Sequence, residues 1–229
     1  MTNYVLVHGG FIGGWYWRDV AELLAKEGHR VEVVEQLPSI GTDPAVLGDL
    51  QADAAVVRQT IDAVGDQVVL VGHSYGGMVI TELADHSAVA HSVYLSGLWP
   101  QRGQSAMDVV AGTGPPPAWL VVRDNGTVEA SDDLEVMRQV WCADVDPQRA
   151  ADNVRRKVPK SISSLAAPST APARGHPVTY IILENDQVIP PAAQEQMVNA
   201  ADHVVRLVSS HQAMFSIPDK LAAVLATVK

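Results

Sequence analysis

The chain has 229 residues, of which 47% are apolar and 18% are charged, a balance typical of folded globular proteins and unlike that of disordered or fibrous chains. Its 26 acidic and 16 basic residues give a formal charge of −10, which argues against nucleic acid as a partner because such a surface repels a phosphate backbone. The single cysteine, Cys142, excludes an internal disulfide, and no apolar run approaches the roughly 18 residues that cross a bilayer. No basic signal region precedes the first expected strand, so we expect a cytoplasmic protein without a membrane partner.

Short apolar runs alternate along the chain with longer segments of helical period, the pattern of a parallel sheet with helices on both faces. In chain order we expect a strand at residues 4–7, a helix at 15–27, a strand at 31–34, a helix at 45–64, a strand at 68–71, a helix at 75–86, strands at 92–95 and 178–183, a helix at 192–200, a strand at 204–208 and a helix at 213–228. The strands are nearly uniformly apolar, as buried parallel strands are. The sequence predicts a single α/β domain over residues 1–229 with a mostly parallel sheet of about six strands.

Residues 97–175 interrupt this alternation and are predicted to form an insertion. They contain no convincing parallel strand, but they include Gly112, Gly114, the proline run 115–117 and two short predicted helices at residues 132–141 and 147–157. Residues 160–174 are rich in Ser, Ala and Pro, which indicates a surface connection that returns to the sheet. Because an excursion of this length inside an α/β domain is most often functional, we expect a small lid over the edge of the sheet.

A Gly-x-Ser-x-Gly segment at residues 72–76 joins a buried strand to a helix. This context is typical of a nucleophile elbow, in which a tight turn holds the serine in a strained conformation and requires glycine two residues before and after it. Ser74 then projects its hydroxyl from the carboxyl edge of the sheet, and the N-terminus of the following helix stabilises negative charge there. The segment predicts Ser74 as a nucleophile.

A serine nucleophile needs a general base, which an acid orients. Of the eight histidines, His211 follows the last strand and precedes the final helix, so it lies at the carboxyl edge, whereas His203 precedes that strand and lies at the opposite edge. Elbow hydrolases carry the acid after the preceding strand. Asp186 occupies that loop and is preferred to Glu184, which lies closer to the strand.

The glycine-rich turn at residues 8–14 lies between the first strand and the first helix. Acyl transfer needs two N–H donors for the oxyanion, one from the residue after the nucleophile and one from such a turn. We assign these donors to Tyr75 and Gly10, with Phe11 as the alternative to Gly10. A dinucleotide-binding turn is the rival interpretation, with Glu35 at the position of a ribose-binding acid, but the glycines do not follow the G-x-G-x-x-G spacing.

Together these residues resemble an α/β-hydrolase, and more narrowly the plant methylesterase and hydroxynitrile lyase branch with its bacterial esterase relatives. The resemblance implies an α/β-hydrolase fold and a hydrolase of small carboxylic esters, with the Ser74, Asp186 and His211 positions matching the family's triad. The segments that carry it are residues 7–10 with Gly14, Trp15 and Trp17, residues 28–31, 72–78 and 180–190, Gln196 with Met197, and residues 211–214.

A hydroxynitrile lyase or another non-hydrolytic enzyme of this fold is the alternative. The lyases typically carry Thr after the first His of the oxyanion turn and Lys after the catalytic His, where this chain has Gly9 and Gln212. These departures favour hydrolysis. A dinucleotide-binding oxidoreductase is the remaining alternative.

The aromatic residues give the only hint about the substrate, a small-molecule ester. Phe11 and Trp99 both follow strand ends at the carboxyl edge, and we expect them to line the substrate pocket. The metal-binding and P-loop spacings are absent, so we expect neither a metal nor another cofactor. The sequence does not indicate an oligomeric state.

Overall fold

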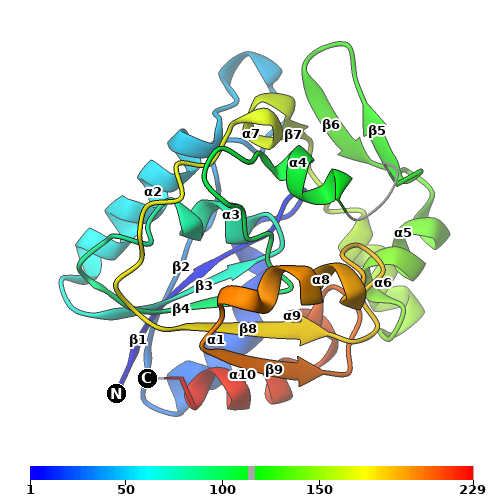
Figure 1. Ribbon diagram of the computed structural model, residues 1–229. Coiled ribbons are helices and arrows are strands. Elements are labelled where there is room, and N and C mark those ends of the chain that lie inside the picture. The colour runs from blue at the N-terminus through cyan, green and yellow to red at the C-terminus, as the bar shows by residue number, and fades with distance from the viewer. Residues whose placement is uncertain (113–116, 229) are drawn as a thin grey trace.

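The computed structural model describes residues 1–112 and 117–228. Gly114, Pro115 and Pro116 of the predicted proline-rich segment lie outside the described residues. At the centre of the described part is a six-stranded sheet in the order β2-β1-β3-β4-β8-β9 (Figure 1). Its strands are β1 (Asn3–Val7), β2 (Arg30–Val33), β3 (Val68–His73), β4 (Val89–Leu95), β8 (Val178–Leu183) and β9 (His203–Leu207).

Every neighbouring pair in this sheet is parallel, which confirms the predicted fold class. Side chains of β1 alternate between the two faces: Tyr4 and Leu6 enter one buried core, and Val5 and Val7 enter the other. Helices α1 (Arg18–Lys26) and α10 (Pro218–Ala226) cover the first face, and α2 (Leu50–Val64), α3 (Gly76–Thr81) and α8 (Pro191–Met197) cover the second (Figure 1). Because all the strands run in one direction, the loops after them gather at one edge of the sheet.

Several predicted helices are shorter or divided in the structure, and α3, for example, ends at Thr81 although the prediction extended it to residue 86. Helix α2 begins only at Leu50, because the Asp49 side chain caps it by accepting from Ala52 N at 2.9 Å; the preceding residues form the short 3-10 helix η2 (Pro44–Val46). The prediction of one helix over residues 213–228 was wrong, since the segment divides into α9 (Ala213–Ser216) and α10. Pro218 separates them, because proline has no N–H to continue the helix of the preceding turn.

The insertion carries secondary structure of its own. The two short helices predicted there are confirmed as α5 (Leu134–Cys142) and α6 (Pro147–Val154), and two more are α4 (Ala106–Ala111) and α7 (Ile162–Ala166). A small antiparallel sheet joins β5 (Leu120–Val122), β6 (Thr127–Ala130) and β7 (Lys160–Ser161), with the β5–β6 hairpin extending away from the main sheet (Figure 1). Whether the insertion acts as a lid stays a prediction.

The prediction that residues 160–174 form a surface connection was wrong for residues 160–166, whereas residues 168–174 form a largely exposed connection without helix or strand. The segment begins with β7, whose Lys160 and Ser161 are buried, and continues into α7, which packs against α2. Its polar residues suggested exposure, but Ser161 Oγ donates to Gly48 O at 2.6 Å, and Lys160 Nζ donates to Ser39 Oγ at 2.7 Å. Burial is tolerated because these polar groups have partners inside the protein.

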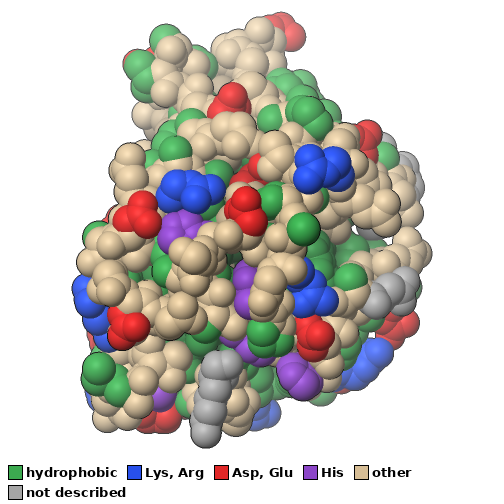
Figure 2. Space-filling model, turned by 60° about the vertical axis from the view of Figure 1, so that its left-hand side comes forward, with side chains coloured by type: hydrophobic (Ala, Val, Ile, Leu, Met, Phe, Trp, Pro, Cys, Tyr) green, Lys and Arg blue, Asp and Glu red, His purple; other side chains and the backbone are tan. Residues whose placement is uncertain are grey.

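The face shown in Figure 2 carries Lys and Arg interspersed with Asp and Glu, so no single-sign patch dominates it. Among the residues that the structure describes, no helix is both long enough and apolar enough to span a membrane.

Candidate active site

The predicted elbow is formed by the end of β3 and the start of α3. Ser74 lies between them with φ +54°, a left-handed conformation that is strained for a residue with a side chain. Two hydrogen bonds hold the turn against the end of β4: Ser74 N donates to Leu95 O at 3.2 Å, and Leu98 N donates to Ser74 O at 2.9 Å. Ser74 is partly exposed although the residues on either side of it are buried. The backbone geometry at Ser74 is therefore the strained strand-to-helix turn that the sequence predicts.

Asp186 and His211 are brought together by the loops after β8 and β9. His211 Nδ1 lies 2.7 Å from Asp186 Oδ2, and both side chains are at least 95% buried. The other oxygen of Asp186 accepts from Val188 N at 2.8 Å and Ile189 N at 2.9 Å. These bonds fix the carboxylate, which in turn orients the imidazole so that its Nε2 is the nitrogen left for chemistry. Glu184, the competing acid, is exposed.

The histidine loop is tied to the elbow through His73, the residue before Ser74. His73 Nε2 is 2.9 Å from His211 O, and the two imidazole ring centroids are 4.6 Å apart. Ser74, His211 and Asp186 thus occupy the same edge of the sheet, while His203 is exposed at the start of β9.

Sequence reasoning missed two polar side chains that hold the acid. Ser96 Oγ donates to Asp186 Oδ2 at 2.6 Å, and Gln194 Nε2 lies 3.4 Å from the same oxygen. Ser96 follows β4 directly and has φ +41°. A serine at the end of the strand next to the elbow strand was the signal that could have identified it.

Two further histidines are neutral parts of the core beneath the site. Burial lowers the pKa of His8 to about 4, and burial holds the pKa of His73 well below its ordinary value, with the nearby His211 acting in the same direction. His8 Nε2 and His73 Nδ1 have no hydrogen-bond partner among the described residues. Protonation of either ring would bury an unpaired charged N–H group.

The glycine-rich turn after β1 lies directly against the elbow. A Cβ placed on Gly9 would lie only 2.9 Å from Ser74 Cβ, so only glycine allows this approach. Among the described residues, the backbone N–H groups of Gly10 and Tyr75 donate to no protein acceptor. Phe11, the alternative donor, has φ +66°. Two free N–H groups beside a strained serine can stabilise an oxyanion.

Phe11 belongs to an aromatic cluster that joins the turn to the insertion. Its ring centroid lies 6.2 Å from that of Trp119 and 6.4 Å from that of Trp141. Trp99 is elsewhere: it stacks on Tyr94, with ring centroids 4.6 Å apart, and belongs to the core on the α2 and α3 face. The structure thus separates the two predicted pocket residues, and a substrate contact stays a prediction for both.

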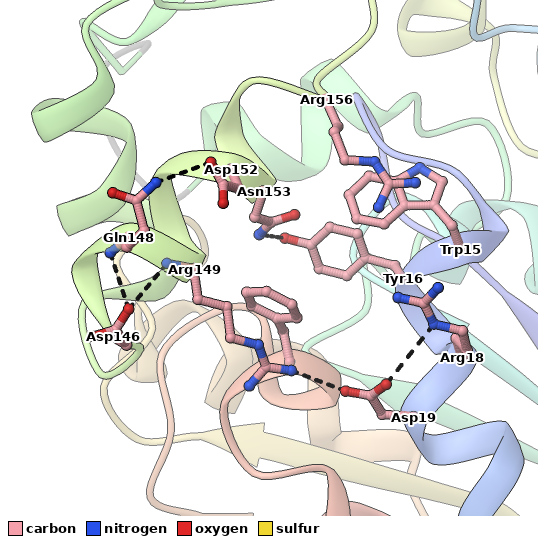
Figure 3. A pocket seen from close by; sticks show the side chains of 11 residues that line it. Trp15, Tyr16, Arg18, Asp19, Asp146, Gln148, Arg149, Asp152, Asn153 and Arg156 are labelled. Atoms are coloured by element: carbon pink, nitrogen blue, oxygen red, sulfur yellow. Dashed lines mark hydrogen bonds and ion pairs between the residues drawn. The ribbon is translucent and has the colours of Figure 1, made fainter.

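A surface hollow of about 440 Å³ lies where α6 meets the turn before α1 (Figure 3). At its base Asn153 donates to the hydroxyl of Tyr16 and, at 2.8 Å, to Gln212 Oε1. Above them Arg156 lies 3.5 Å from the Trp15 ring centroid. Because Gln212 directly follows His211, this contact links helix α6 to the histidine loop.

Asp144, between α5 and α6, holds the same loop from the other side. Its carboxylate accepts from Ser210 N at 2.9 Å, from the Ser210 hydroxyl and from Ser216 Oγ at 2.7 Å. These bonds lower the pKa of Asp144 although partial burial acts in the opposite direction. Gln212 N also donates to Trp141 O at 3.2 Å. The insertion therefore contacts the residues immediately before and after His211.

No cluster of three or more metal-ligating side chains occurs among residues 1–112 and 117–228. Cys142 is buried, and burial raises its thiol pKa to about 12.

Comparison with known proteins agrees with the fold and with the resemblance to methylesterases. A carbendazim-hydrolysing esterase of Nocardioides sp. is 39% identical over 122 residues, which span 51% of this chain and 50% of that protein. Methylesterase 8 of Arabidopsis thaliana is 25% identical over 210 residues, or 86% of this chain and 77% of that one. The crystal structure of a pyrethroid hydrolase from Sphingobium faniae has a TM-score of 0.82 at 25% identity, covering 99% of this chain and 96% of the other.

The sequence model of the alpha/beta hydrolase family matches residues 4–224. This match spans nearly the whole chain, including both glycine-rich turns and the Asp186–His211 pair, and the parallel sheet has the architecture that the match requires. The protein belongs to the alpha/beta hydrolase family.

Proposed function

We propose that the protein hydrolyses small carboxylic esters through an acyl-enzyme, with Ser74 as the nucleophile, His211 as the general base and Asp186 as the acid that orients it. The observation that carries the proposal is the buried 2.7 Å contact between Asp186 and His211, at the sheet edge that also holds the strained Ser74. The names of the relatives, which are esterases and hydrolases, support a carboxylic ester hydrolase.

In the first step Ser74 Oγ attacks the ester carbonyl carbon while His211 Nε2 takes the hydroxyl proton. The carbonyl oxygen becomes an oxyanion, which the backbone N–H groups of Gly10 and Tyr75 stabilise. His211 returns the proton to the leaving alcohol, and an acyl-enzyme remains. Water, deprotonated by His211, then attacks the acyl group, and the carboxylic acid and free Ser74 are released.

Neutral esters with apolar groups are the proposed substrate class. Phe11 stands next to the donor Gly10, and its contacts with Trp119 and Trp141 provide an aromatic wall. The formal charge of −10 disfavours anionic esters and favours release of the acidic product, an effect that added salt weakens.

Hydrolysis of short p-nitrophenyl esters by Ser74→Ala and His211→Ala tests the proposal. Each variant is expected to lose at least about 10³-fold in kcat, and the double variant is expected to lose little more, because nucleophile and base act as a unit. Ser87→Ala, at an exposed serine, is the matched control. Full activity of Ser74→Ala would place the chemistry elsewhere, and additive losses would contradict a coupled triad.

A fluorophosphonate that labels Ser74 in the wild type, but not in Ser74→Ala, gives an independent readout of the nucleophile. A screen of methyl, aryl and lactone esters with the same enzyme then defines the substrate within the proposed class.

A further inference from the structure

Lys160 carries a buried amine that takes no part in the proposed steps of ester hydrolysis. Its side chain is fully buried, although it comes from β7 of the insertion and carries an amine. Burying an ammonium group is costly unless partners compensate for the lost water. The groups around Lys160 therefore indicate why this amine is buried.

The amine lies among polar and aromatic partners from three other parts of the fold. Lys160 Nζ donates to Ser39 Oγ at 2.7 Å, lies 4.0 Å from Asp53 Oδ2 on α2, and stands 3.2 Å from the ring centroid of Tyr75. Tyr75 in turn donates its hydroxyl to Asp53 Oδ2 at 2.8 Å, and Ser39 N donates to Asp53 Oδ1 at 2.8 Å. The cation and the tyrosine are therefore held by one carboxylate.

The same lysine lies next to both residues proposed as oxyanion donors. A Cβ built on Gly10 would lie 3.3 Å from Lys160 Cδ, 3.9 Å from Lys160 Cε and 3.9 Å from Tyr75 Cβ, so the three residues meet at one point. Two residues earlier, Val158 N donates to Phe11 O at 2.9 Å. The segment from Val158 to Lys160 thus contacts the glycine-rich turn through the backbone of Val158 and contacts Tyr75 through the side chain of Lys160.

We propose that Lys160 is a positioning residue of the oxyanion hole, which holds Gly10 and Tyr75 in register and places a buried positive charge beside the oxyanion that forms between them. The proposal rests on the proposed function. Because Lys160 is buried, where charges interact more strongly than in water, a cation behind the donors stabilises negative charge that exists in the tetrahedral state and is absent from the bound ester. Removing this charge is therefore expected to lower kcat and to weaken the binding of oxyanion mimics, with little change in KM.

The charge of Lys160 depends on the groups that face it. Burial lowers its pKa to about 7, while the Asp53 carboxylate acts to raise it. The other titratable groups near it are Tyr75, whose pKa burial raises well above its ordinary value, and His8, whose pKa is lowered to about 4. An oxyanion nearby favours the ammonium form, so the tetrahedral state takes up a proton at Lys160 when the free enzyme lacks it.

A trifluoromethyl ketone matched to the best ester tests this role. Ser74 Oγ adds to its carbonyl carbon, the C=O oxygen becomes the oxyanion, and the serine proton moves to His211, so the adduct mimics the tetrahedral state. Lys160→Met is expected to raise the inhibition constant and lower kcat by 10- to 100-fold each, with KM changed less than threefold. The matched control is Lys157→Met, which removes the ammonium group of the insertion that pairs with Asp132 at 2.7 Å.

The pH dependence of inhibition tests the role of Lys160 in the wild-type enzyme as well. For the wild type, the inhibition constant is expected to rise above pH 7 by up to tenfold per pH unit, because adduct formation then takes up the Lys160 proton. Lys160→Met should lack this rise. If Lys160→Met does not fold, Lys160→Gln, which keeps a donor for Ser39, and the wild-type profile still decide the question.

The outcomes separate the two proposals. Equal inhibition of Lys160→Met and Lys157→Met, a flat wild-type profile above pH 7, or a lower melting temperature with unchanged kcat would each overturn the role of Lys160. If Ser74→Ala also hydrolyses the ester, the proposed function fails; if Ser74→Ala is inactive, only the role of Lys160 fails.

Discussion

Acidification should destabilise the protein through His8 and His73 before most of its carboxylates are protonated. Both rings are buried, and each has one nitrogen without a partner among the described residues. On folding, the pKa of His8 falls from its ordinary 6.5 to about 4. Between pH 6.5 and about pH 4, His8 is therefore protonated in the unfolded chain and neutral in the native state. The free energy of unfolding then falls as pH falls, by about 1.4 kcal/mol per pH unit for each such histidine.

From pH 7.0 to 4.5, His8 alone lowers the free energy of unfolding by about 2.4 kcal/mol, and His73, whose pKa is lowered in the same direction, adds to this loss. A loss of this size is a substantial part of the stability of an ordinary domain. Urea unfolding at several pH values measures it. His8→Asn retains a donor near Gly9 O and should reduce the slope by one histidine's share, compared with a control, His203→Asn, at an exposed position. A slope in His8→Asn equal to that of the control would refute the reasoning.

Two further substitutions test the support of the site. Gly76→Ala should lower stability by about 2 kcal/mol and reduce activity, because its Cβ would lie 2.8 Å from His8 O; an unchanged melting temperature in calorimetry would contradict this. Asp144→Ala removes the hydrogen bonds that hold Ser210, the residue before His211, so we expect a 3- to 30-fold lower kcat. Because Asp144 is partly exposed, we expect the free energy of unfolding to fall by only about 1 kcal/mol. Steady-state kinetics against Asp152→Ala, an exposed carboxylate of α6, checks it, and equal kcat in the two variants would show that Asp144 does not act on the site.

The sheet and the order of the candidate triad residues were predictable because each depends on local signals. Uniformly apolar runs predicted all six strands to within a few residues, and the strained turn at Ser74 is encoded by its flanking glycines. The placement of Asp186 and His211 followed from parallel topology, since loops after parallel strands meet at one edge.

The contacts made by polar residues were not predictable, because they depend on partners far away in the chain. Lys160 and Ser39 are 121 residues apart in the sequence, and Asp144 and Ser210 are 66 residues apart. No periodicity or local spacing therefore predicts either contact. The serine-rich segment after Lys160 has the composition of a surface loop, and hydrogen bonds inside the fold allow Ser161 and Ser164 to be buried. Trp99 follows a strand end, as a pocket residue would, but its ring stacks on Tyr94.

These contacts change how the insertion is understood. A detachable cover would touch the catalytic residues only through substrate, whereas here the insertion reaches them from two directions. Its strand β7 packs Lys160 against Gly10 and Tyr75, and the segment from α5 to α6 contacts the residues on either side of His211. A rigid displacement of the whole insertion would therefore break contacts to both the glycine-rich turn after β1 and the loop that carries His211. An opening that keeps these contacts is restricted to parts of the insertion outside β7 and the α5–α6 segment.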